Sequence, residues 1–514
     1  MANPFDNVTP NTFVELIDGR AFTFKVEIFN EDGKMLQVKK AGIELLEIED
    51  NILNPFLTGV LILKNPFDML ERQTEQNVGE EKLTLNTFRF RGDARDYVNI
   101  FIAPAIGDEL NDVEHVSSDF YTLKQTFVIH KIEDVPSSNA TTKTKKLHLH
   151  DLKYQKMIEK DLYWSSSAAA IRQGVGAITK PISQLTNHQR SIQTGVALKD
   201  MIQQAIPGQK FEKNWDVGAR EIFYTSPAGS KALDDIMYMS SEHVSSDDTE
   251  NQPCIFRHER FTKSWSLLPL KKYFTGGYDS AAGAPGPLQN ETFYISNEID
   301  ETGDQKPEPK APTGGTTLTN DVHFPDLSLI KGYVFSEMPG LDQQNILIST
   351  PVLAYEPYTK EFQFYHKQQA IESMFNFFKS NVTDTLKGGT TGPYTDFFIN
   401  KTKLENKNVN LLYTTHTDNL GTLLTSRNKV LQKALLGGPA LMFNIIGMPN
   451  RRAGRFISVD RQNPYEENDY DSKLLGQYFV TQVTHRFSNS GYVNNVLGVK
   501  PYFYNKVDFN NDIK

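Results

Sequence analysis

The chain has 514 residues, a net charge of −9 and a pI near 5.7, with 39% hydrophobic and 11% aromatic residues. This length exceeds one ordinary hydrophobic core and predicts three or four domains or sub-domains of a globular protein. The acidic balance argues against nucleic-acid binding through a basic face, and the single cysteine excludes a disulfide framework and a cysteine-based zinc cluster.

Localisation signals are not evident in the sequence. The N-terminal segment MANPFDNVTP has no basic stretch followed by an apolar one, so we expect no secretion signal. The most apolar run, residues 434–448, is interrupted by glycine, proline and asparagine and is too short to span a membrane. A reducing cytoplasm fits the cysteine usage, and Cys254 is interpreted as a small buried hydrophobe.

The first 152 residues predict β structure. Residues 20–37 contain two alternating strands around an Asp-Gly turn, and residues 40–67 contain two apolar strands in which Gly59 indicates a bulge or a close backbone approach. Residues 81–89 and 97–102 predict further strands, and residues 127–152 predict a hairpin.

Three histidines fall on that last hairpin. His148 and His150 are two residues apart on one strand, and His130 lies on its partner, so the three imidazoles could together bind a metal ion. No carboxylate motif accompanies them, and ordinary half-buried strand histidines are the simpler interpretation.

Helices are predicted in the middle of the chain. Asp151 is expected to cap a helix, and an apolar stripe predicts another before Pro207: Val196, Leu198, Met201, Ile202 and Ala205. A further helix carries Leu233, Ile236, Met237 and Met239, and short strands are expected at residues 254–258 and 264–268.

Residues 275–325 are rich in glycine, proline and charge and predict a flexible linker or surface insertion. Beyond it we expect strands at residues 329–335, 345–353 and 409–413, helices at residues 366–378 and 421–436, and a loop at residues 388–392. The last hundred residues end in a strand, a glycine-containing turn, a second strand and an aromatic hairpin.

Two basic clusters occur in the sequence: Lys143, Lys145 and Lys146, and Arg451, Arg452 and Arg455. Each is interpreted as a solvated strand end or turn.

Several of these segments, in this order, resemble the central baseplate hub proteins of contractile-tailed bacteriophages, which are related to spike-base proteins of type VI secretion. The resemblance begins with N-P-F-L-T-G before V-L-I-L at residues 54–63, and continues with an E-x-N-W segment, read as a strand, at residues 212–215. It is strongest in the last hundred residues, at Gly447, Gly454, Gly476, Tyr478, Val480, Val483, His485 and Phe487.

The resemblance implies an α+β, mainly β fold with two tail-tube-like antiparallel β-barrel modules, a helical connector and a small inserted α/β domain. The first module would comprise residues 1–164, the connector and small domain residues 165–274, the linker residues 275–325, and the second module residues 326–514. Residues 127–134 and 478–485 align without a gap, which supports two related modules.

The resemblance also implies a structural virion protein of the tail baseplate, made in the host cytoplasm. Its expected form is a homotrimeric hub with pseudo-sixfold symmetry that connects the tail tube to the central spike and lets the tape measure and DNA pass. The implied partners are the spike protein, the tail tube or tube-initiator protein, the tape measure protein and baseplate wedge proteins, with no sequence-specific nucleic-acid binding and no membrane span.

Common catalytic signatures are absent from the sequence, including HExxH, GxxxxGK[ST] and GxSxG. Acid pairs such as Glu47 and Glu49, or Glu466 and Glu467, are expected by chance among 63 acidic residues. We therefore expect no enzyme, no catalytic residue, no cofactor and no metal. A tail-associated cell-wall hydrolase and a peripheral baseplate or receptor-binding protein remain as alternatives.

Overall fold

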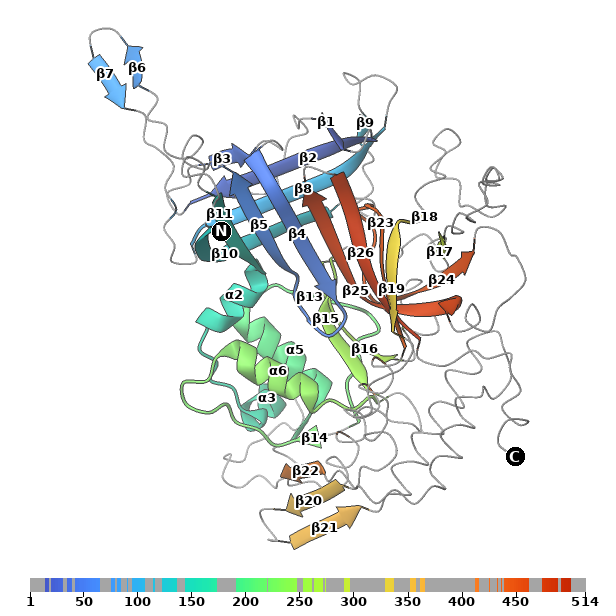
Figure 1. Cartoon of the computed structure of the whole chain (residues 1–514). Coiled ribbons are helices and arrows are strands. Elements are labelled where there is room, and N and C mark those ends of the chain that lie inside the picture. The colour runs from blue at the N-terminus through green and yellow to red at the C-terminus, as the bar shows by residue number, and fades with distance from the viewer. Residues whose placement is uncertain are drawn as a thin grey trace, which may run out of the picture. The chain divides into compact units, whose positions relative to one another are not determined.

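The structure is a computed structural model of the whole chain (Figure 1). The residues it describes are 14–17, 20–30, 35–38, 42–64, 75–78, 81–84, 90, 95–106, 114–115, 123–135, 144–172, 191–219, 221–246, 253–260, 263–270, 273, 291–295, 329–336, 352–356, 361–365, 412–415, 425, 432, 436, 439–461, 474–488 and 491–500. The expected helix at 366–378, the loop at 388–392, nearly all of the linker at 275–325 and most of the helix at 421–436 lie outside this set.

The described residues are mainly β with few helices, which confirms the expected class. Their strands form a large mixed sheet and no closed barrel, so the prediction of closed antiparallel barrel modules is wrong for this part of the chain. The sheet is also not purely antiparallel, because β17 (Glu291–Ile295) lies parallel to both β18 (Leu329–Ile330) and β24 (Arg455–Arg461). Alternation along a strand predicts its buried face but does not predict the direction of its neighbour.

The chain divides into two compact units. The first unit comprises Met1–Gln155, Ile446–Arg452 and Val483–Asn495. The second comprises Lys156–Ile445, Ala453–Gln482 and Val496–Lys514.

The first unit is built on antiparallel strands in the order β1-β2-β8-β10-β11-β5-β4, and the end of β25 (Gly476–Ser488) follows β4. These strands are β1 (Val14–Ile17), β2 (Arg20–Phe29), β4 (Ile43–Asn51), β5 (Thr58–Lys64), β8 (Tyr97–Ile106), β10 (Leu123–Val135) and β11 (Thr144–Asp151). Short strands add to them: β3 (Met35–Val38), β6 (Glu75–Val78), β7 (Glu81–Thr84) and β9 (Glu114–His115).

Local predictions hold well in this unit. β2 and β3 pair antiparallel as the Asp-Gly turn predicts. A Cβ at Gly59 would lie 2.8 Å from the Glu47 carbonyl oxygen, so this glycine permits the close backbone approach that the sequence indicated. Asp151 caps the first turn of α2 (Leu152–Glu159), because its Oδ1 accepts the Lys153 N–H at 2.7 Å.

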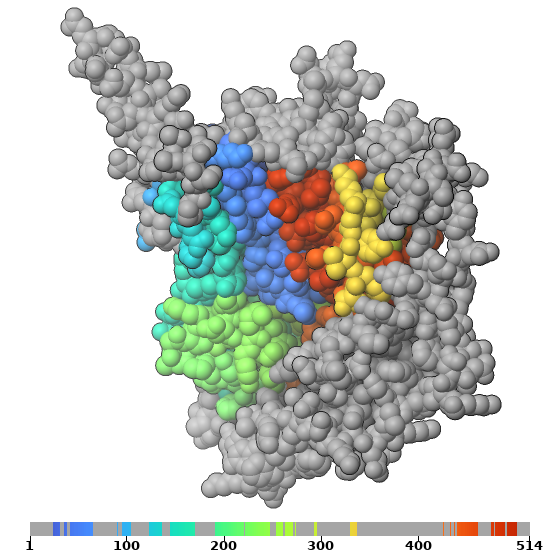
Figure 2. Space-filling model, viewed as in Figure 1, coloured from blue at the N-terminus to red at the C-terminus, as the bar shows by residue number. Residues whose placement is uncertain are grey.

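Residues from the two ends of the chain share the core of the first unit. Phe487 on β25 and Tyr492 on β26 (Gly491–Val499) are buried in it. Figure 2 shows C-terminal residues in red beside N-terminal residues in blue, where β25 pairs with β4. The Phe487 ring stacks on Tyr492 at 3.8 Å and lies 5.7 Å from Phe24. The buried members of this core are Phe24, Val26, Ile28, Val38, Ile43, Leu46, Ile48, Leu57, Leu61, Leu63, Val98, Ile100, Ile102, Leu123, Phe127, Ile129, Leu147, Leu149, Phe487 and Tyr492.

The second unit begins with helices and short strands. These elements are α3 (Ser166–Arg172), α5 (Thr194–Ala205), α6 (Ala232–Ser241), β12 (Ile192–Gln193), β13 (Lys210–Phe211), β14 (Glu221–Ile222), β15 (Cys254–His258) and β16 (Ser264–Pro269). α5 packs on α6 (Figure 1), and the predicted stripe of α5 is buried at Leu198, Met201 and Ile202. Residues 212–215 form a turn, in which the Trp215 N–H donates to the Glu212 carbonyl, and not the expected strand.

The second unit also contains further strands of the large sheet. β24 pairs antiparallel with β25, and β19 (Gly332–Ser336) pairs antiparallel with β23 (Ala440–Ile446), which neighbours β26. A separate three-stranded sheet contains β20 (Val352–Glu356), β21 (Glu361–Tyr365) and β22 (Leu412–Thr415).

Candidate functional site

The eight residues that carry the strongest resemblance are packed into the β structure. A Cβ at Gly447 would lie 2.3 Å from Cγ of Tyr492, so only glycine lets this ring approach the backbone. Gly454 and Gly476 have φ values of +89° and +123°, which side-chain-bearing residues rarely adopt. These glycines are required by the backbone path and by packing.

His485 is fully buried in the first unit and fully hydrogen-bonded. Its Nε2 lies 3.0 Å from the carbonyl oxygen of Arg451, which can only accept, so Nε2 carries the proton. Nδ1 therefore accepts from the Tyr492 hydroxyl at 2.8 Å and from the Asn494 side-chain amide at 2.9 Å. With both ring nitrogens used in this way, His485 joins β25, β26 and the segment around Arg451.

Tyr478 and Lys500 form a second buried contact, in the second unit. The Tyr478 hydroxyl donates to the Leu474 carbonyl, and the Lys500 ammonium lies 5.0 Å from the centre of the Tyr478 ring. Lys500 also donates to the Leu475 carbonyl at 2.7 Å, while burial lowers its pKa to about 7. Val480 and Val483 are buried as well, so these parts of the motif also serve the core.

The arginine cluster is buried, contrary to the prediction of a solvated turn. Arg451, Arg452 and Arg455 are only 6%, 3% and 9% exposed. Arg451 donates to the carbonyl of Ile446 and to Oδ1 of Asn494. Asn494 also contacts His485, so Arg451 lies beside the His485 network. Sequence charge alone does not reveal such backbone acceptors.

The lysine cluster is placed on β11, apart from Lys143, which is outside the described residues. Lys145 pairs with Asp134 at 3.0 Å, and Lys146 lies 3.9 Å from Glu133. Both lysines thus face acidic residues on the neighbouring strand β10.

The three strand histidines are divided between two contacts. A β-bulge between Ile129 and Lys131 displaces His130, whose ring stacks on His150 at 4.5 Å. His148 instead pairs with Glu133 at 2.9 Å, and this hydrogen bond, together with that from Lys131, lowers the pKa of Glu133 to about 2. Stacked parallel rings do not direct their nitrogen lone pairs to a common point, so the trio does not form a ligand set.

One of the two acid pairs lies in the described residues, and each of its members contacts another polar side chain. Glu47 pairs with Arg486 at 3.3 Å, and Glu49 accepts from the side chain of Asn51 at 3.5 Å. Glu466 and Glu467 lie outside the described residues.

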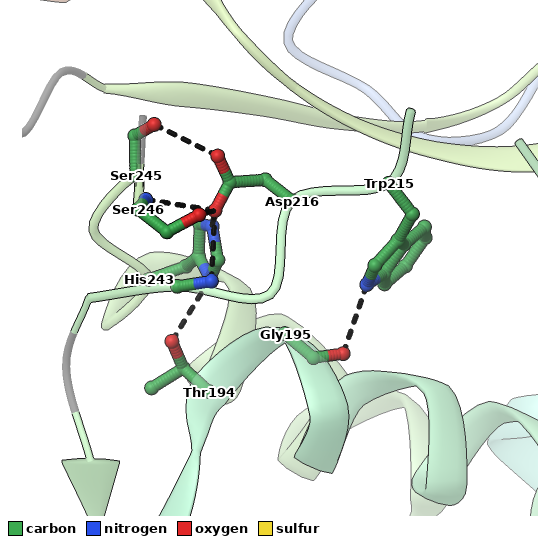
Figure 3. A network of polar contacts seen from close by, with 8 residues as sticks. Thr194, Gly195, Trp215, Asp216, His243, Ser245 and Ser246 are labelled. Atoms are coloured by element: carbon green, nitrogen blue, oxygen red, sulfur yellow. Dashed lines mark hydrogen bonds and ion pairs between the residues drawn. The ribbon is translucent and has the colours of Figure 1, made fainter. Parts of the chain in front are cut away.

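A polar network that the sequence analysis missed lies in the second unit (Figure 3). Oδ1 of Asp216 accepts the backbone N–H of Gly218 at 2.8 Å and of Ser246 at 2.9 Å, while Oδ2 accepts the Ser245 hydroxyl at 2.8 Å. His243 Nε2 lies 3.3 Å from Asp216 Oδ1. Burial raises the pKa of Asp216, but the contacts with His243, Ser246 and Ser245 outweigh burial and hold this pKa below its usual value.

Tight packing at the start of α5 positions this network. Thr194 Oγ1 lies 2.9 Å from His243 Nδ1, and a Cβ at Gly218 would lie 2.5 Å from the same Oγ1. A Cβ at Gly195 would lie 2.1 Å from the Asp216 carbonyl oxygen, and the Trp215 indole donates to the Gly195 carbonyl at 2.9 Å (Figure 3). Small residues therefore bring α5 and the loop after Trp215 together.

Cys254, at the start of β15, lies beside this network and is only partly buried, so the prediction of a small buried hydrophobe is wrong. The potential ligand atoms of Asp216, His243 and Cys254 all lie within 4.8 Å of one another. These residues are the one group of three among the described residues that could hold a metal ion. No short sequence motif connects residues 216, 243 and 254, which explains why pattern reasoning did not find them.

Across the described residues, no helix is both long enough and apolar enough to cross a membrane.

No family model and no curated protein matches the sequence. Among solved structures, the chain is similar to a tail protein from Neisseria meningitidis, with 8% identity, a TM-score of 0.45 and coverage of 94% of this chain and 98% of that one. It is also similar to the 43 kDa tail protein of prophage MuSo2 from Shewanella oneidensis, with 11% identity, a TM-score of 0.41 and coverage of 93% and 98%. A third likeness, to the half-lidded Francisella PdpA-VgrG complex, has 9% identity and a TM-score of 0.41 and covers 97% of this chain and 61% of that one. With TM-scores below 0.5, these likenesses assign no function.

Proposed function

We propose that the chain is a structural protein of a phage tail baseplate, specifically the hub that joins the tail tube to the central spike. The observation that carries this proposal is that the residues on which the sequence resemblance rests have structural roles. Gly447, Tyr478, His485 and Phe487 are all engaged in packing or hydrogen bonds of the aromatic hairpin. Residues that build a fold in this way suit an assembly protein better than a catalyst.

The internal repeat adds support. Residues 127–134 lie on β10 and residues 478–485 lie on β25, and each strand pairs with the strand that follows it in the chain. Two related β modules in each of three chains would give a ring with pseudo-sixfold symmetry, which suits a junction between a sixfold tube and a threefold spike.

The partners under this proposal are two further copies of the chain, the spike protein, the tail tube or tube-initiator protein, the tape measure protein and baseplate wedge proteins. The assembled ring would leave an axial passage for the tape measure and for DNA. Its location is the tail baseplate of the virion, and it has no enzymatic role.

Electron microscopy of the purified full chain, with class averaging, tests the proposal. We expect rings with a central hole and threefold or apparent sixfold symmetry, alone or after addition of the neighbouring spike protein. Compact monomers that persist in the presence of the spike protein would refute the hub.

A zymogram on bacterial cell wall provides the matching test of the non-enzymatic role. We expect no cleared band at the position of the chain, with a lysozyme lane as the positive control. A cleared band from the wild-type chain would contradict the proposal. If the band persisted in a purified Glu47→Gln, Glu49→Gln variant, the hydrolytic residues would lie elsewhere in the chain.

A further inference from the structure

The network around Asp216 contains an unusual histidine. The His243 side chain is fully buried, and its Nε2 makes no well-formed hydrogen bond, because its contact is the 3.3 Å approach to Asp216 Oδ1. A buried nitrogen of this kind calls for a physical explanation, and a bound ion is one such explanation. Four ligands at about 2.0–2.1 Å from a tetrahedral zinc ion are separated by about 3.3 Å, which matches this nitrogen-to-oxygen distance.

The other ring nitrogen of His243 has the arrangement typical of a metal ligand. Nδ1 lies 2.9 Å from Thr194 Oγ1, and Thr194 is fully buried at the start of α5. A metal-binding histidine usually donates its second N–H to an oxygen that fixes the tautomer and the ring orientation. With Nδ1–H donating to Thr194, the lone pair of Nε2 points toward Asp216.

The carboxylate is also held in place. Ser245, Ser246 and the backbone at Gly218 donate to Asp216, and these donors fix the orientation of its carboxylate group. A carboxylate whose orientation is fixed in this way is typical of metal ligands, which are themselves held by hydrogen bonds.

Cys254 completes the set with a soft ligand. Its sulfur lies within 4.8 Å of the ligand atoms of Asp216 and His243, and the side chain remains partly accessible. Thiolate and imidazole ligands favour Zn²⁺, whereas Mg²⁺ and Ca²⁺ prefer oxygen ligands alone.

We propose that Asp216, His243 and Cys254 form a binding site for one Zn²⁺ ion, with water as the fourth ligand. The ion would tie the start of β15 to the end of α6 and to the loop after Trp215. This inference is independent of the hub proposal, since it concerns three residues of one unit and requires no partner chain.

Titration of the metal-free full chain with Co²⁺ alone, followed by displacement with Zn²⁺, tests the site. We expect one equivalent of Co²⁺ and a thiolate-to-cobalt charge-transfer band, which Zn²⁺ abolishes. The Cys254→Ser variant should lack this band and should bind Co²⁺ at least tenfold more weakly. The control His130→Ala, which alters the stacked strand histidines, should retain both the band and the affinity.

A wild-type measurement protects the test against misfolding of the variant. Cys254 is the only cysteine, so the rate of its reaction with a thiol reagent reports on this site alone. Saturating Zn²⁺ should slow the reaction at least tenfold. An unchanged rate, the absence of a charge-transfer band in the wild type, or equal affinity in Cys254→Ser would each overturn the proposal.

Discussion

At the scale of single residues, Gly447 shows how strongly one position can constrain the packing. Gly447→Ala would place a methyl group against the Tyr492 ring, and we expect it to reduce the free energy of unfolding by about 1–3 kcal/mol. Hydrogen exchange of peptides from β26 should report faster opening.

Gly332→Ala is the matched control for this substitution. No atom lies within 4 Å of a Cβ built at Gly332, so the change should alter the free energy of unfolding by no more than about 0.5 kcal/mol. Equal exchange rates in the Gly447→Ala and Gly332→Ala variants would contradict the assigned close contact.

Lys500 provides a prediction about pH. Burial lowers its pKa from 10.5 to about 7, so between these values the unfolded chain binds more protons than the folded chain. The free energy of unfolding should therefore rise with pH over this window, by at most about 1.4 kcal/mol per pH unit from this group. Lys500→Met should remove this part of the slope.

Tryptophan fluorescence during chemical unfolding at several pH values measures this effect. The three tryptophans, Trp164, Trp215 and Trp265, all belong to the second unit, as does Lys500. Lys231→Met serves as a control, because Lys231 is partly exposed in an ion pair with Asp161. If the free energy of unfolding depended on pH in the same way in wild type and Lys500→Met, burial would not lower the pKa of Lys500.

Residue-scale prediction from sequence succeeds where the cause is local. Gly59 and Asp151 are recognisable because a glycine inside an apolar strand and an aspartate before a helix have few other uses. Arg451 and Cys254 are not recognisable, because their surroundings come from distant segments.

At the scale of elements, the aromatic hairpin formed by β25 and β26 stabilises strands near the N-terminus. Phe487→Ala would leave a cavity beside Phe24, and we expect a loss of about 3–5 kcal/mol in the free energy of unfolding of the first unit. Hydrogen exchange of β2 peptides, which are remote in sequence from the substitution, should accelerate.

Phe223→Ala is the control for the loss of a phenyl ring. Phe223 is 47% exposed and belongs to the second unit, so β2 exchange should be unaffected. If Phe487→Ala also left β2 exchange unchanged, residues 24 and 487 would not share one core.

Element prediction from sequence identified most of the described strands and the helices around residues 200 and 236. The resemblance implied a strand at residues 212–215, but these residues form a turn, and the Trp215 indole donates to a carbonyl of α5. The parallel pairs of β17 also escaped prediction, since pairing partners are chosen by tertiary packing.

At the scale of the whole molecule, the first unit is discontinuous in sequence. A fragment of residues 1–155 lacks Phe487 and Tyr492, and its core would be left open to water. We expect this fragment to be poorly soluble and to show no cooperative thermal transition by circular dichroism. A soluble fragment with a sharp transition would instead support an independently folding module at residues 1–164.

The organisation of the whole chain is the feature that the sequence predicts least well. The hub resemblance anticipated a β module at each end of the chain, but nothing in the local pattern of residues 483–495 indicates that they pack with residues near position 24. Such pairing depends on the complementary shapes of segments that are remote in sequence.

The distance between Phe24 and Phe487 along the chain, 463 residues, also has a consequence for biosynthesis. At about 5–20 residues per second, a ribosome needs roughly 20–90 seconds to reach the second phenylalanine after the first. Throughout that interval the core of the nascent N-terminal strands is incomplete, so their apolar side chains are exposed and prone to aggregation. Production of this protein in a cell should therefore depend on chaperone capacity and on the rate of translation, even though the finished core is well packed.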